Sequence, residues 1–211
     1  MQKLFSEGVG SQDANGQWQP HTGFKDSELG RIPAGWEVMQ LGDAALLQRG
    51  FDLPSQDRIK GEVPIISSSG VAGYHNEYQV KGPGVVTGRY GTIGEVFYVE
   101  PNHWPLNTSL WVKDFHGNYE LFVYYLLKTI DFKKFSEKTG VPGVNRNDLH
   151  KLKIALPPVL EQKEISKILQ AVETKLNHLT TQKSQTQQLK KGLMQKLLTG
   201  QIRVKPEPQD H

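Results

Sequence analysis

Residues 156–198 read LPPVLEQKEISKILQAVETKLNHLTTQKSQTQQLKKGLMQKLL, and this stretch decides the architecture of the chain. After Pro158 it contains no proline and a single glycine, Gly192. Its apolar residues recur at steps of four and three, the heptad spacing of a helix that packs against another helix. This spacing predicts a partner-facing seam made of Ile165, Leu169, Val172, Leu176, Leu179, Leu193 and Leu197.

A helix from Leu160 to Leu198 spans roughly 60 Å at 1.5 Å per residue. A small domain cannot cover the apolar seam of so long a helix, so the seam needs a second helix, from the same chain or from a second copy. The alternative is a helix that packs along its own domain. Gly200 is expected to end the helix, because a glycine commonly follows the last helical residue.

Upstream, residues 31–158 predict a domain of mixed strands and helix. Segments such as EVPIISSSG (62–70) and NTSLWVKD (107–114) are typical of short strands joined by tight turns. In residues 118–138, Leu121, Tyr125, Leu126 and Ile130 recur at helical spacing and predict an amphipathic helix. The expected fold class is therefore α+β, a globular domain followed by a long C-terminal coiled-coil helix.

The flanks of these two parts are polar. Ser11–Gly30 contains glycines and no periodicity, so residues 1–30 are interpreted as a linker and residues 201–211 as a flexible tail. Four parts follow: 1–30, 31–158, 159–200 and 201–211. MQKLFSEG at Met1–Gly8 and MQKLLTG at Met194–Gly200 repeat one phrase at the two ends of the chain.

Composition excludes several classes of protein. The chain has 211 residues and no cysteine, so it has no disulfides and no thiolate metal site. Its seven histidines show no metal-binding spacing, and no metal is expected. No apolar run approaches the length of a membrane helix and no secretory signal is visible, so a cytoplasmic protein is expected. Between residues 159 and 205, nine lysines and arginines stand against three glutamates, which favours a polyanion or an acidic partner; a solvated lysine face on the helix is the alternative.

Several segments in this order resemble the DNA-specificity (S) subunits of type I restriction–modification systems. LPPVLEQKEISKILQAVETKLNHL and the closing QKLLTG resemble the helical region of that family, with its Pro-Pro and its Glu161-Gln162 pair. GRYGTIGEV (88–96) and GVPGVNRNDLHKLKI (140–154) resemble segments of its target-recognition domain, and ELGRIPAGWEVMQLGD (28–43) resembles its entry segment. S subunits hold two recognition domains and two helical regions in tandem, so the resemblance implies a half-subunit in which MQKLFSEG is the tail of a preceding helical region.

The resemblance implies a non-catalytic protein that reads double-stranded DNA. S-adenosylmethionine, ATP and Mg would belong only to the partners, a methyltransferase subunit and a restriction subunit, and this chain would hold no cofactor. A half-subunit lacks an internal partner for its seam, so we expect a homodimer that reads a palindromic bipartite site. Two alternatives remain open: a half-subunit that competes for the methyltransferase or modifies its specificity, and a fragment of a fused restriction–methylation enzyme, which would need methyl-donor motifs that the chain lacks.

Candidate DNA contacts are polar side chains on turns, because Arg and Lys suit guanine and phosphate while Asn suits adenine. Four turn segments supply the candidates: Arg89 and Tyr90; Lys138, Thr139, Asn145 and Arg146; Ser68, Tyr74 and His75; and Arg49. Structural alternatives stand beside them. Tyr90 could be core with Arg89 paired to an acid, Asn147 or Asp148 could cap a helix, and residues 67–75 could be simple hairpin polarity.

Overall fold

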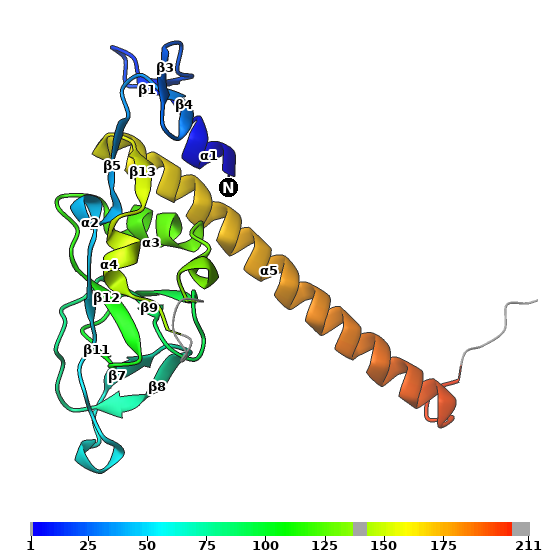
Figure 1. The fold of residues 1–211 in the computed structure, drawn as a ribbon. Helices are drawn as coiled ribbons and strands as arrows, with labels where there is room; N and C mark the ends of the chain where they lie inside the picture. Colours follow the sequence, from blue (N-terminus) through cyan, green and yellow to red (C-terminus); the bar gives the residue numbers. More distant parts are fainter. Residues whose placement is uncertain (1, 137–142, 204–211) are drawn as a thin grey trace, which may run out of the picture. The chain divides into compact units, whose positions relative to one another are not determined.

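A computed structural model describes residues 2–136 and 143–203, apart from the side chain of Gln2. The chain divides into two units, residues 1–167 and residues 168–211. The first unit holds every strand and all helices but most of the last one (Figure 1). This is the expected α+β class, with the long helix at the C-terminal end.

Two antiparallel or mixed sheets form the body of the first unit. The larger sheet has the order β10-β9-β12-β6 and is antiparallel throughout; its strands are β6 (Leu46–Arg49), β9 (Gly84–Gly88), β10 (Val96–Val99) and β12 (Ser109–Asp114). The smaller sheet has the order β11-β7-β8, with β11 parallel to β7; its strands are β7 (Val63–Ser67), β8 (Gly70–His75) and β11 (Trp104–Pro105). Both sheets are short-stranded, as the alternation of β-branched residues and turn residues predicted.

Three two-stranded pairings complete the first unit. They are β1 (Ser11–Gln12) with β2 (Trp18–Gln19), β3 (Phe24–Ser27) with β4 (Gly30–Pro33), and β5 (Glu37–Gln40) with β13 (Lys153–Leu156). The first pairing and strand β3 lie in residues 1–30, the segment interpreted as a linker. Local turn chemistry explains them: Asp13 Oδ1 accepts hydrogen bonds from the backbone N–H of Asn15 and Gln17, both at 2.9 Å, and the Ser27 hydroxyl donates to Gly30 O at 2.6 Å.

Helical elements are short in the first unit: α1 (Gln2–Ser6), α2 (Leu41–Ala44), η1 (Ser55–Asp57), α3 (Glu120–Lys128), η2 (Phe132–Phe135) and α4 (Arg146–His150). The predicted helix in residues 118–138 exists as α3 but ends before Ile130. The Thr129 hydroxyl donates to Leu126 O at 2.7 Å, and Asp131 then caps η2 by accepting from the Lys133 N–H at 3.2 Å. Side-chain hydrogen bonds to the backbone therefore replaced the continuing helix.

The core lies where α3 and the sheets bury their apolar faces. Phe122, Val123 and Leu127 of α3 are fully buried. One cluster joins Ile66, Val86 and Val99, with the half-buried Phe97 and Trp111 against it. A second cluster joins Leu53, Ile65, Trp104 and Leu106, against which Phe51 packs.

The long helix α5 spans Val159–Leu198 and is the predicted element within one residue at its start. Gly200 follows it with φ +70°, the left-handed conformation that glycine adopts most readily at a helix end. Its N–H donates to Leu197 O at 3.2 Å, which satisfies one of the last carbonyls of the helix.

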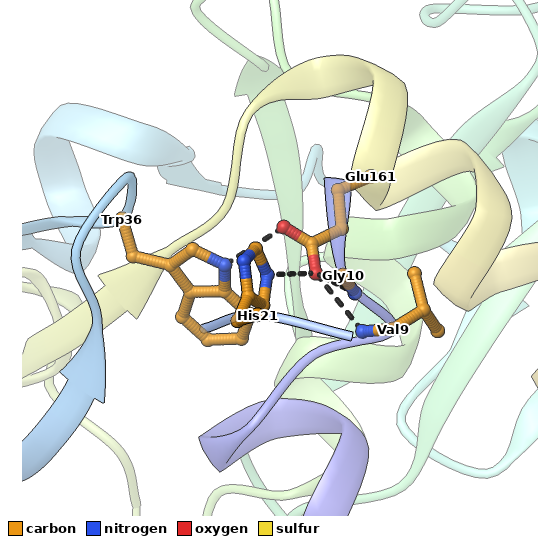
Figure 2. Close-up of polar contacts among 5 residues, drawn as sticks. All are labelled: Val9, Gly10, His21, Trp36 and Glu161. Carbon is orange, nitrogen blue, oxygen red and sulfur yellow. Dashed lines mark hydrogen bonds and ion pairs between the residues drawn. The ribbon is translucent and has the colours of Figure 1, made fainter. Parts of the chain in front are cut away.

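The first turn of α5 carries a buried carboxylate that joins it to the N-terminal part of the first unit (Figure 2). Oε1 of Glu161 accepts hydrogen bonds from the N–H of Val9 at 2.9 Å and of Gly10 at 3.1 Å, and lies 2.8 Å from Nε2 of His21. Its Oε2 accepts from the Trp36 indole N–H at 2.8 Å. We call these five residues the Glu161 joint.

Gln162, the next residue, forms hydrogen bonds with the segment that leads into α3. Its Oε1 accepts from the Tyr119 N–H at 2.9 Å, while its Nε2 donates to Asn118 Oδ1 at 2.7 Å and to Pro157 O at 2.9 Å. Asn118 in turn donates to Ala44 O at 2.9 Å. The Glu161-Gln162 pair thus joins the first turn of α5 to both the N-terminal segment and the entrance of α3.

Candidate DNA-binding cleft

Four of the candidate residues, from three separated segments, line one open cleft in the first unit. The cleft has a volume of about 700 Å³ and is lined by Gln48, Arg49, Gly50, Phe51, Asp52, Arg89, Leu110, Asn145 and Arg146. Three arginines therefore gather in one place. Such a concentration of guanidinium groups suits phosphate and guanine edges.

Sheet pairing brings Arg49 and Arg89 to the same end of the larger sheet. The central strand β12 pairs with β6 through Leu110 opposite Arg49, and with β9 through Ser109 opposite Gly88. Arg89 directly follows Gly88, and its N–H donates to Thr108 O at 3.0 Å. Arg49 and Arg89 therefore lie on either side of the start of β12, next to neighbouring residues of that strand.

Backbone pairing then adds the segment that carries Asn145 and Arg146. The Val144 N–H donates to Arg89 O at 3.0 Å, and Tyr90 forms a bridge with Gly143. A Cβ atom at Gly143 would overlap the ring of Tyr90, so this close approach requires glycine. The two turns that the sequence singled out separately are therefore one surface.

Tyr90 supports Arg89 in this arrangement. The Arg89 guanidinium lies 4.5 Å from the centre of the Tyr90 ring, within the range of a cation–π contact. Among the described residues no carboxylate lies within ion-pair distance of Arg89 or Arg146. The alternative in which an acid pairs with Arg89 is thus not seen in the described part of the chain.

Asn145 has a structural task as well as a place in the cleft. Its Oδ1 accepts from the Asn147 N–H at 3.0 Å, which makes it the N-cap of α4. The structural alternative placed this cap at Asn147 or Asp148, and the structure has it two or three residues earlier. The cap positions Arg146, the first residue of α4, at the cleft.

His150, at the other end of α4, connects this helix to β6. Its Nε2 accepts from the Leu47 N–H at 2.9 Å. Burial lowers the pKa of His150, and the nearby positive charge of Arg146 lowers it further. A neutral ring is the form that accepts this bond, so His150 contributes to holding Arg146 beside Arg49.

Asp52 is a cleft residue that the sequence analysis missed. Arg49 Nη2 lies 3.3 Å from its Oδ1, and Asn107 donates to the same oxygen. Both side chains of this ion pair are more than half exposed, so the pair adds little to stability. A carboxylate at this point can accept from a cytosine amino group, which gives the cleft an acceptor beside its donors. Gln48 was missed too, although both residues flank Arg49 in the sequence.

The remaining candidates lie elsewhere or outside the described residues. Lys138 and Thr139 belong to the range 137–142, which the structure does not describe. Ser68 lies beside the turn at Gly91, whose added Cβ would be 3.5 Å from the Ser68 hydroxyl. Tyr74 is exposed but lines a different hollow with Val71, Phe97 and Tyr98.

His75 is a packing residue in the described structure. It is buried, its Nδ1 accepts from the Ile59 N–H at 3.0 Å, and its ring meets Trp104 edge-on at 5.1 Å. These contacts give His75 a packing role, and we leave His75 out of the contacts proposed below.

The predicted seam of α5 is exposed along most of its length. Ile165 is fully buried in the first unit and Leu169 is 5% exposed, so neither offers an open surface. Beyond them, Val172, Leu176 and Leu179 are 51%, 58% and 47% exposed. Leu193 and Leu197 are also more than a third exposed. The seam available to a partner therefore begins at Val172.

The described ranges contain neither a metal-ligand cluster nor a membrane-spanning helix. No group of three or more His, Asp or Glu side chains could hold a metal ion there. None of the described helices combines the length and apolarity that crossing a membrane requires.

Comparison with known proteins shows what the chain is similar to. Residues 33–189 match the family model for the type I restriction modification DNA specificity domain. A putative type I restriction enzyme MjaX specificity subunit from Methanocaldococcus jannaschii is 30% identical over 225 residues, covering 97% of this chain and 50% of that protein. The chain spans about half the length of the curated relatives it matches.

Solved structures share the fold. A chain from a study of complex assembly and conformational transition of the type I R-M system has a TM-score of 0.66 at 19% identity, covering 85% of this chain and 47% of that one. The type I restriction-modification S subunit from M. genitalium has a TM-score of 0.60 at 20% identity, covering 78% of this chain and 46% of that one.

Proposed function

Because the chain belongs to the family of type I restriction modification DNA specificity domains, we propose that it reads one half of a bipartite target in double-stranded DNA. The observation that carries the proposal is the cleft, where Arg49, Arg89 and Arg146 meet from segments far apart in the sequence. In this role the chain performs no catalysis. It directs a methyltransferase subunit and a restriction subunit to the site that it reads.

The polar side chains of the cleft match groups on DNA. A guanidinium can donate two hydrogen bonds to guanine O6 and N7, or it can bind phosphate. Asp52 accepts from the amino group of cytosine, and Gln48 suits adenine. Phosphate contacts supply affinity and base contacts supply specificity, so a cleft with both donors and an acceptor supports reading rather than general attachment.

The test compares arginines inside the cleft with an arginine outside it. Arg89→Ala and Arg146→Ala are expected to weaken specific DNA binding by about 1–3 kcal/mol each if they contact base edges. Arg31→Ala is the matched control, because Arg31 also lies over an aromatic ring, that of Phe24 at 5.0 Å, but does not line the cleft. Binding is measured by fluorescence anisotropy with target and scrambled duplexes. Equal losses for Arg31→Ala and Arg89→Ala would remove the cleft as the reading surface.

We also propose that the exposed seam of α5 pairs with the seam of a second copy. Val172, Leu176 and Leu179 continue the heptad spacing and lie exposed, and burying such side chains favours association. A two-fold dimer presents two copies of one cleft, so its target would be palindromic with a fixed gap. Co-purification with the methyltransferase and restriction subunits of the same cell tests the proposed partners.

A further inference from the structure

Two segments near the ends of the chain share a similar sequence and a similar backbone conformation. MQKLFSEG at Met1–Gly8 and MQKLLTG at Met194–Gly200 differ by the insertion of Glu7 and by two similar residues. Helix α1 ends at Ser6 and Gly8 follows with φ +71°; α5 ends at Leu198 and Gly200 follows with φ +70°. Both phrases therefore close a helix with a left-handed glycine.

The first of these phrases occupies a defined socket in the first unit. The ring of Phe5 lies 5.5 Å from that of Phe122 on α3. A Cβ atom at Gly8 would overlap Glu161 Oε1, so only glycine fits there, and the same oxygen binds the next two N–H groups (Figure 2). We call the surface formed by Phe122, Trp36 and Glu161 the helix-end socket.

The second phrase presents the same chemistry with apolar side chains in solvent. Met194 and Leu198 are 51% and 84% exposed. Gly200 has open space around the position of a Cβ atom. A segment with the sequence and end geometry of the socket's occupant thus lies exposed at the end of α5.

We propose that the helix-end socket of one copy accepts the end of α5, residues 194–200, of a second copy in exchange for its own Gln2–Gly8 segment. This inference rests on the dimer proposed above. The socket lies at the first turn of α5, because Glu161 belongs to that turn, so a partner helix that ends in the socket runs antiparallel along the seam. The Gln2–Gly8 segment is then a competitor built into the same chain.

Competition has a measurable consequence for dimer strength. When a binding surface is free only part of the time, its apparent dissociation constant equals the intrinsic constant divided by the free fraction. Weakening the internal occupant should therefore strengthen the dimer, whereas damaging the end of α5 should weaken it. An ordinary packing role for Gln2–Gly8 predicts no strengthening by any substitution there.

The experiment uses three glycines that share a left-handed backbone. Gly8→Ala is expected to lower the dimer dissociation constant about 5–10-fold, and Gly200→Ala to raise it by a similar factor. Gly16→Ala is the matched control, since Gly16 has φ +76° and open space around it. Phe5→Ala provides a second way to release the segment, with the exposed Lys3→Ala as its control. Sedimentation equilibrium measures the constants, and urea unfolding checks that each variant is folded.

Photo-cross-linking locates the contact. Benzoylphenylalanine in place of Leu198, in a mixture of ¹⁴N and ¹⁵N chains, should attach to the other copy near Phe122 or Glu161. The exchange would be overturned, and the dimer proposal would stand, if Gly8→Ala and Phe5→Ala left the dimer dissociation constant unchanged. Cross-links that map to other residues would have the same meaning. A protein that stays monomeric at every concentration would overturn both.

Discussion

Two stretches of the same helix behave in opposite ways. In Val159–Lys167, Glu161, Gln162, Ile165 and Ser166 are all buried, and each polar group finds a partner within the first unit. Beyond Leu169 the apolar spacing continues, yet Val172, Leu176 and Leu179 are exposed. Hydrophobic periodicity therefore shows that a face needs a partner without showing which molecule supplies it.

The Glu161 joint offers the strongest test of the buried stretch. Glu161→Ala leaves the N–H groups of Val9, Gly10 and Trp36 without their acceptor, and unpaired buried donors are costly. We expect the free energy of unfolding to fall by about 3 kcal/mol or more, measured by urea denaturation. Glu164→Ala is the control on the same helix, because its ion pair with the exposed Lys167 should contribute less than about 1 kcal/mol. Similar losses in the two variants would mean that the joint does not organise this end of α5.

A charge on the exposed stretch should act on association and leave folding alone. Leu176→Asp places a carboxylate on the proposed dimer seam, where burial without a partner is unfavourable. The dimer dissociation constant should rise about 100-fold, close to 2.7 kcal/mol, with the unfolding of the first unit unchanged. Lys175→Asp changes an exposed neighbour away from the seam and controls for helix propensity and charge. If Lys175→Asp disrupts association equally, the heptad seam is not the interface.

The smallest expected effect comes from the protonation of a buried histidine in the first unit. Burial lowers the pKa of His103 in the first unit, so the unfolded chain takes up a proton at a pH where the native state does not. Stability is then fully present above the ordinary histidine pKa of about 6.5 and falls as the pH drops below it, towards the lowered native value. The melting temperature of the first unit should therefore decline from pH 7 to pH 5, and His103→Gln should flatten that decline.

Local patterns predicted the elements but not the cleft. The α5 boundaries, the short strands and the glycine at the helix end follow from spacing and turn residues within each segment. The meeting of Arg49 with Arg89 depends on β12 pairing with both β6 and β9, which no local pattern encodes. The candidate list accordingly contained the three arginines that line the cleft together with His75, which is buried against Trp104, a residue distant in sequence.

Polar residues were the hardest to assign, because the same side chain serves both structure and recognition. Asn145 caps α4 and also lines the cleft. From the sequence, Asn147 or Asp148 was the possible cap and Asn145 a DNA contact. Asp52 was overlooked because a single carboxylate carries no pattern of its own. Its place beside Arg49 and Asn107 becomes visible only when the strands are paired.

Selection of bound sequences from random duplexes, with the chain alone and with the methyltransferase subunit of its own cell, tests the central claim most directly. If two copies joined along α5 each read DNA through the arginine cleft, the enriched sites will be two inverted half-sites with one fixed gap, and Arg89→Ala will alter both halves alike. Enrichment of a single uninterrupted site, or of two unrelated halves, would contradict the account.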